Sequence, residues 1–103
     1  MAYKLIVSKE AHRDIDEISG YIACELKNPK AAISFLDDVE ESYRFIEDNP
    51  FMYSLCDDRW LRKEGYRKIP IKNYLIIYRV NETQKYVFVV RVIYGPRDYA
   101  KLL

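Results

Sequence analysis

The pattern of apolar and polar positions predicts a short strand and then an amphipathic helix at the start of the chain. In Tyr3–Val7 the residues Tyr, Leu and Val alternate with Lys and Ile, as expected for a strand. Ser8 follows at a position suited to a helix N-cap. Beyond it, apolar residues recur at spacings of three and four, namely Ala11, Ile15, Ile18, Ile22 and Leu26. This stripe predicts a helix that runs to about Lys27.

A second amphipathic helix is predicted between two Asn-Pro pairs. Asn28-Pro29 ends the first helix and starts the next, because proline is tolerated at the first helical position. Asn49-Pro50 ends the second helix, since proline disfavours helical backbone in the residue before it. The apolar stripe between the pairs is Ala32, Leu36, Val39, Tyr43 and Ile46. Two helices joined by so short a link are expected to form an antiparallel hairpin.

The remainder of the chain predicts a loop and then three strands. Residues 51–64 have no clear period and are interpreted as a long loop with room for one turn of helix. The predicted strands are Tyr66–Ile71, Tyr74–Val80 and Tyr86–Tyr94, and Arg97–Leu103 is expected to be a short terminal helix. The order predicts one α+β domain over residues 1–103, with an N-terminal strand, a helical hairpin and a three-stranded antiparallel β-meander. The hairpin would cover one sheet face and leave the other open.

Composition narrows the class of protein. Half of the 103 residues are apolar and about a third are charged, as is ordinary for a soluble globular domain. The sequence has no run of 18 apolar residues and no charged-then-apolar leader, which predicts a cytoplasmic protein without a membrane span. Cys24 and Cys56 have no metal-binding spacing, and the chain has a single histidine, His12. We therefore expect two reduced thiols, no metal and no cofactor.

Charge is divided unevenly between the two halves of the chain. Residues 1–58 carry six Lys/Arg and thirteen Asp/Glu, a net charge of −7, whereas residues 59–103 carry eleven and three, a net charge of +8. Such asymmetry favours an acidic or polyanionic partner for the basic half. The alternative is that the acidic helices and basic strands are merely solvated.

Arginines within the predicted strands are candidate binding residues. Arg79 and Arg91 lie in strongly apolar runs, so each must face solvent, an anion or a partner. If the strand register aligns them, Arg67, Arg79 and Arg91 share one sheet face and would contact phosphates. The alternative is that each arginine pairs with a helix carboxylate.

The stretch Asn73–Asp98 resembles the RelE/ParE superfamily of toxins from bacterial type II toxin–antitoxin systems. The resemblance rests on the strands YLIIYRV and VFVVRVIYG and on the terminal PRD. In that family the last strand ends in an arginine, an apolar pair, a His or Tyr, a glycine and basic residues. The matching positions here are Arg91, Val92-Ile93, Tyr94, Gly95 and Arg97-Asp98. The order of the predicted elements extends the resemblance over nearly the whole chain.

Nuclease members of this superfamily cleave messenger RNA on the ribosome without a metal. That reaction needs a base, an acid and cations for the phosphate charge. His12 falls on the first helix, away from the strands, so Tyr94 and Tyr99 are the catalytic candidates, as proton donors. A tyrosine pKa near 10 makes either a weak base. Leu75 also stands where the nucleases tend to carry an arginine.

The closing GPRD is more similar to the basic ending of ParE-type members, which poison DNA gyrase, than to that of the nucleases. The leading hypothesis is therefore a toxin of the plasmid-stabilisation type that binds and inhibits gyrase, with Arg67, Arg79, Arg91 and Arg97 contacting the target. The alternatives are a ribosome-dependent mRNA endoribonuclease and a non-toxic member that only binds its antitoxin. The resemblance also implies a cognate antitoxin that covers the basic surface and supplies the contacts to operator DNA.

Overall fold

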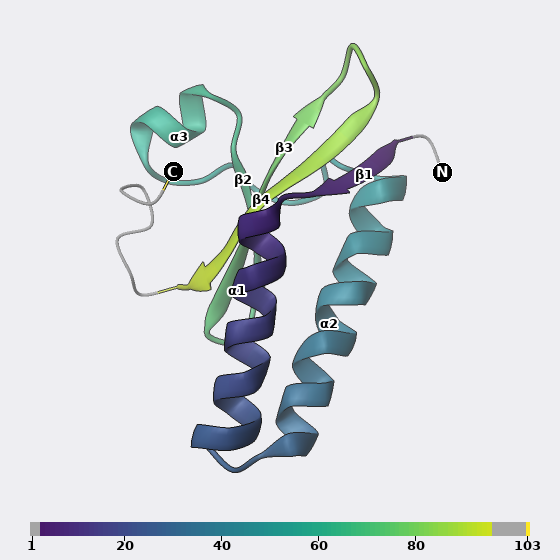
Figure 1. Ribbon diagram of the computed structural model, residues 1–103. Helices are drawn as coiled ribbons and strands as arrows, with labels where there is room; N and C mark the ends of the chain where they lie inside the picture. The colour runs from purple at the N-terminus through teal and green to yellow at the C-terminus, as the bar shows by residue number, and fades with distance from the viewer. Residues whose placement is uncertain (1–2, 96–102) are drawn as a thin grey trace.

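The computed structural model describes residues 3–95 and 103, which form a sheet packed against a helical hairpin (Figure 1). Its elements are β1 (Lys4–Val7), α1 (Lys9–Gly20), the π-helical turn η1 (Tyr21–Glu25), α2 (Pro29–Asp48), α3 (Arg59–Lys63), β2 (Arg67–Ile71), β3 (Tyr74–Asn81) and β4 (Tyr86–Tyr94). The predicted strands and the second long helix are confirmed, whereas the first predicted helix is α-helical only to Gly20 and continues as η1. The terminal helix predicted for Arg97–Leu103 lies outside the described residues except for Leu103.

The sheet has four strands in the order β1-β4-β3-β2 and is mixed. Neighbouring strands among β2, β3 and β4 pair antiparallel, whereas β1 pairs parallel to β4. The prediction of a three-stranded antiparallel meander is therefore incomplete, because the N-terminal strand joins the same sheet. Within the described part of the chain, no helix has the length and apolar character needed to cross a bilayer.

The helix caps explain where the hairpin begins and turns. The Ser8 hydroxyl accepts a hydrogen bond from the Ala11 amide at 2.9 Å and donates one to the Val90 carbonyl at 2.7 Å. It therefore starts α1 and ties that start to β4. Asn28 caps α2 by accepting from the Ala31 amide, with Pro29 at the first helical position.

Two apolar clusters lie on opposite faces of the sheet. The larger, under α1 and α2, includes Phe35, Val39, Ile76, Tyr78 and Val89, all nearly or fully buried. The smaller contains Cys56, Leu61, Ile77 and Ile93, and Tyr66 packs against it. The prediction of an open second face is wrong, because α3 and the segment before it cover part of that face.

A β-bulge in β4 changes which side chains face the helices. Tyr78 opposes Val89 but its neighbour Ile77 opposes Arg91, so Val90 is an extra residue. Val89 belongs to the helix-side cluster, whereas Ile93 belongs to the opposite one. Strict alternation along the strand would place both on one face, but the one inserted residue reverses the pattern.

Candidate functional site

Arg91 is held by an ion pair with α1. Its Nε donates to Asp14 Oδ2 at 2.7 Å and its Nη2 donates to Asp14 Oδ1 at 3.0 Å. Hydrogen bonding to Asp14 raises the pKa of Arg91 above its ordinary value. Arg91, the arginine of the family motif, is therefore paired with a helix carboxylate, as in the alternative given for the strand arginines.

Arg67 is also engaged inside the fold. Its Nη1 donates to the Tyr53 carbonyl at 2.6 Å, and its guanidinium lies 5.1 Å from the centre of the Phe51 ring. Arg67 opposes Tyr78, whose side chain lies in the helix-side cluster. Because directly opposed residues share a sheet face, Arg67 belongs to the face that carries the helices.

Arg79 lies on the other face, over an aromatic side chain. Its guanidinium is 4.8 Å from the centre of the Tyr66 ring, and the Trp60 ring lies 5.9 Å from the same Tyr66 ring. The Arg79 side chain is 45% exposed, and the nearest carboxylate oxygen, on Glu64, is 4.0 Å away. We call Trp60, Tyr66 and Arg79 the aromatic–arginine cluster.

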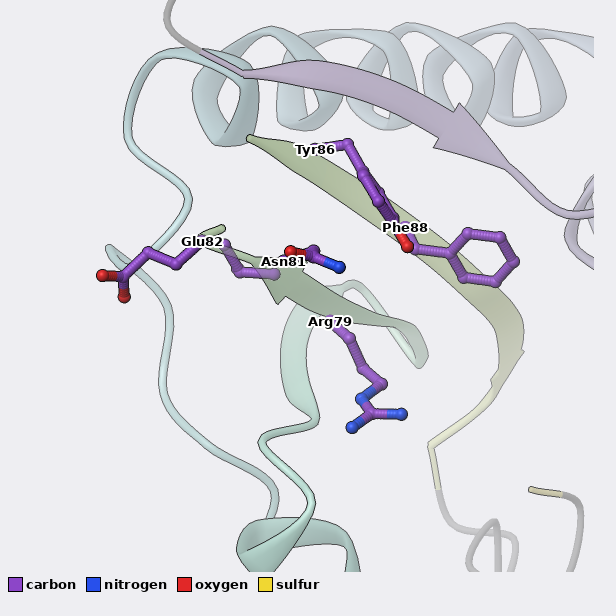
Figure 2. Close-up of a pocket in the computed structure, with 6 residues that line it drawn as sticks. Arg79, Asn81, Glu82, Tyr86 and Phe88 are labelled. Atoms are coloured by element: carbon purple, nitrogen blue, oxygen red, sulfur yellow. The ribbon is translucent and has the colours of Figure 1, made fainter. Parts of the chain in front are cut away.

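A hollow of about 470 Å³ adjoins this cluster at the tip of the β3–β4 hairpin. Figure 2 shows its lining side chains extending from the end of β3 and the start of β4. The lining residues are Arg79, Val80, Asn81, Glu82, Tyr86 and Phe88. Arg79 therefore belongs both to the cluster and to the wall of the hollow.

The predicted shared face of three arginines is wrong, because Arg67 and Arg79 lie on opposite sides of the sheet and Asp14 holds Arg91. Two lysines of this region, Lys68 and Lys72, also have contacts of their own. Lys68 donates to Asp57 at 2.8 Å, which lowers the pKa of Asp57, and Lys72 donates to Ser34 at 3.3 Å.

Tyr94, a catalytic candidate, lies at the end of β4 away from the aromatic–arginine cluster. Its side chain is exposed, and its ring meets that of Tyr74 edge-on at 5.9 Å. Burial, followed by the neighbouring Tyr21 and Tyr94, raises the pKa of Tyr74. Arg97 and Tyr99, the other predicted site residues in this region, lie outside the described residues.

Sequence reasoning missed Trp60 and Tyr66. Trp60 belongs to the stretch interpreted as a loop, and Tyr66 is the first residue of the predicted strand Tyr66–Ile71, so neither has a periodic partner. The available signal was the presence of Arg79 in an apolar strand together with Trp60, the single tryptophan of the sequence, since guanidinium groups stack on aromatic faces. Their sequence separation hid the contact.

A second candidate surface lies on the outside of the helical hairpin. A groove of about 370 Å³ runs between α1–η1 and the first half of α2. Its lining is mostly small or apolar: Asp16, Ser19, Gly20, Ala23, Pro29, Ala32, Ile33 and Leu36. Ile33 and Leu36 are 59% and 41% exposed, so two large apolar side chains face solvent beside a shallow wall. We call this the outer groove.

The cysteines and the histidine contribute no site among the described residues. Cys24 is exposed on η1 and Cys56 is buried beneath α3, so the two thiols are separate. No cluster of three metal-ligating side chains occurs within residues 3–95. His12 is exposed on α1.

Comparison with solved structures shows the fold to be shared with bacterial toxins. The chain superposes on a chain of the chromosomal ParDE system of P. aeruginosa with a TM-score of 0.70 and 18% identity, covering 90% of this chain and 96% of that one. It superposes on a free mutant of E. coli RelE with a TM-score of 0.67 and 14% identity, covering 99% and 93%. For the RelBE2 complex of Mycobacterium tuberculosis the values are 0.63 and 18%, covering 91% and 99%.

Sequence comparison supplies the family. No curated protein matches the chain. The family model for the ParE toxin of the type II toxin–antitoxin system parDE matches residues 5–99 and therefore covers all the described strands and helices except the first residue of β1. The chain thus belongs to the ParE toxin family of type II toxin–antitoxin systems.

Proposed function

We propose that this toxin arrests growth by binding DNA gyrase and inhibiting it. The observation that carries the proposal is the match to the ParE model over residues 5–99. ParE-type members poison gyrase, and an inhibitor that acts by binding needs a complementary surface rather than an acid–base pair. The proposed site of action is the cytoplasm, where gyrase and its DNA are found.

The described residues support a binding role more than a nuclease role. Cleavage of RNA requires cations and a proton donor around one phosphate. Asp14 engages Arg91, the Tyr53 carbonyl engages Arg67, and Arg79 lies away from Tyr94.

A ribosome-dependent endoribonuclease is the second candidate. The observation in its favour is the exposed Arg79 stacked on Tyr66, because such a pair can bind a phosphate beside a stacked base. A non-toxic member that only binds its antitoxin is the third candidate, and it predicts neither gyrase inhibition nor mRNA cleavage.

We further infer a cognate antitoxin that docks an amphipathic helix in the outer groove. The structures of E. coli and M. tuberculosis relatives described as toxin–antitoxin complexes support such a partner. Ala23 and Gly20 form a low wall that permits close approach, and Ile33 and Leu36 offer apolar contacts. This arrangement suits helix-in-groove recognition. Another antitoxin segment would cover the basic surface, and the complex would bind operator DNA through the antitoxin.

Two assays on one protein preparation test the target. Relaxed plasmid is incubated with gyrase, ATP and the purified chain, and supercoiling is followed on agarose gels. The same chain is added to cell-free translation, with primer extension on the template mRNA. Loss of supercoiling with intact mRNA is expected. Normal supercoiling with discrete ribosome-dependent cuts would establish the nuclease instead, and no effect in either assay would favour the non-toxic member.

A further inference from the structure

We propose that the aromatic–arginine cluster and the adjoining hollow form the surface that docks the protein target. The partner feature is an acidic segment in which a carboxylate lies next to an apolar side chain. This inference rests on the proposed function in one respect, namely that the chain acts by binding a protein. It assigns the contact to the sheet face opposite the helical hairpin, away from the outer groove.

Arg79 differs from the other strand arginines in the state of its donors. The guanidinium groups of Arg67 and Arg91 donate hydrogen bonds to acceptors within the fold. Among the described residues, the Arg79 side chain makes no hydrogen bond, and its contact with Glu64 is at the 4.0 Å limit of an ion pair. A half-exposed guanidinium of this kind can form a bidentate pair with an incoming carboxylate.

The cluster is held in place before any partner binds. The Tyr66 amide donates to the Leu61 carbonyl, and the Tyr66 carbonyl accepts from the Cys56 amide. Leu61 and Cys56 are fully buried in the smaller apolar cluster, so the backbone under the Tyr66 ring is fixed. The Tyr66 ring in turn contacts both the Arg79 guanidinium and the Trp60 ring.

The exposed residue types match those that dominate protein interfaces. Trp60 remains 50% exposed although it is the only tryptophan and has a large apolar ring. Tryptophan, tyrosine and arginine are the residues enriched at interface hot spots. When a partner binds, the aromatic rings of the cluster would bury apolar area, and the Arg79 charge would orient the partner.

Charge and shape favour an acidic peptide over a nucleic acid. Residues 59–103 carry a net charge of +8, which attracts an acidic partner. The hollow itself is lined by one cation, Arg79, together with Glu82 and the rings of Tyr86 and Phe88. A nucleic acid strand would need several phosphate contacts along its path, and the Glu82 carboxylate on the wall of the hollow would repel phosphates. One carboxylate and one apolar side chain fit the lining instead.

The test measures binding of purified DNA gyrase to the immobilised chain by biolayer interferometry. Trp60→Ala and Arg79→Ala are compared with two matched controls, Phe45→Ala and Arg44→Ala, which remove an exposed ring and an exposed arginine from α2. Each cluster variant is expected to weaken binding by about tenfold or more, whereas the controls bind like the wild type. Thermal unfolding of every variant confirms that the fold is retained.

Conservative variants and a second probe separate the outcomes. Trp60→Phe keeps a ring and is expected to restore most of the binding lost in Trp60→Ala. If the wild type binds gyrase and both alanine variants bind equally well, the surface assignment is overturned while the proposed function stands. If the wild type does not bind gyrase but binds a labelled single-stranded RNA through Trp60 and Arg79, both are overturned. Binding to neither probe also overturns both.

Discussion

The carboxylate of Asp14 on α1 holds Arg91 on β4 through two parallel hydrogen bonds of 2.7 and 3.0 Å. The same carboxylate accepts from the Val92 amide at 2.9 Å. These contacts fall immediately after the bulge at Val90, where β4 has no neighbouring strand on that side because β1 pairs with residues 86–89. Asp14 therefore accepts the hydrogen bond of a β4 amide that has no neighbouring strand, and it fixes α1 against β4.

Replacing Asp14 with Asn is expected to destabilise the protein by about 2–3 kcal/mol, because an amide cannot neutralise Arg91 and one strong acceptor is lost. The two side chains are only 11% and 24% exposed, so solvent cannot fully replace the pair. Urea unfolding followed by circular dichroism gives the change. Arg13→Ala, at an exposed position next to Asp14, is the control and should stay within about 0.5 kcal/mol of the wild type. Equal stability of Asp14→Asn would show that the pair contributes nothing.

Removal of Arg91 is expected to reduce growth arrest through loss of stability rather than loss of a target contact. Arg91→Ala leaves Asp14 without its partner, so the folded fraction falls at the growth temperature. Arg97→Ala is also expected to reduce growth arrest, as a prediction from the basic ending of the sequence. Toxicity is measured by viable counts after induction, at two temperatures. Arg91→Ala should recover at the lower one, and full growth arrest from the double variant would contradict a role for these residues.

The order and type of the elements followed from local chemistry. Ser8 and Asn28 were identifiable as caps, and the proline after each Asn set the boundaries of α2, because these residues act within one helical turn. The strands of the sheet were visible as apolar runs with polar turns. Such signals depend on neighbours in sequence, which is why they could be predicted without knowing the fold.

The positions of the arginines could not be predicted because they depend on register. A single extra residue at Val90 moved Ile93 to the opposite face from Val89, and nothing in an apolar run marks that insertion. The pairing of Asp14 with Arg91 joins residues 77 positions apart. The contact of Arg79 with the Tyr66 ring likewise arises because separate segments of the chain meet in the folded sheet. Long-range packing, rather than composition, decides which of the strand arginines can contact a partner.

Tyr94→Phe is expected to leave growth arrest unchanged. The substitution keeps the edge-on contact with Tyr74 and removes only the hydroxyl, which a gyrase inhibitor acting by binding does not need as a proton donor. Viable counts after induction of the wild type and the variant provide the measurement. Tyr99→Phe is the companion variant for the other catalytic candidate. A loss of toxicity of about a hundredfold or more in either would support general acid catalysis and the nuclease.

Two buried tyrosine hydroxyls are expected to affect stability with opposite sign. The Tyr78 hydroxyl donates to the Pro50 carbonyl at 2.7 Å, so Tyr78→Phe should destabilise by about 1–2 kcal/mol and leave that carbonyl unpaired. The Tyr43 hydroxyl is buried without a hydrogen-bond partner within the described structure, so Tyr43→Phe should stabilise by up to about 1 kcal/mol. Urea unfolding of both variants gives the comparison. Destabilisation by Tyr43→Phe would indicate an undetected partner, such as a bound water.

The same two tyrosines are expected to make the protein sensitive to alkali. Burial raises the pKa of Tyr43 and of Tyr78 to about 12, against an ordinary value of about 10 in the unfolded chain. Between these values the folded state binds more protons than the unfolded state, so the free energy of unfolding falls as pH rises. This contribution is fully present below about pH 10 and is lost as pH approaches about 12. Denaturant unfolding across this window should show a steeper decline for the wild type than for the double variant Tyr43→Phe/Tyr78→Phe. Other titrating groups are common to both proteins and cancel in the comparison, so parallel declines would contradict the raised pKa values.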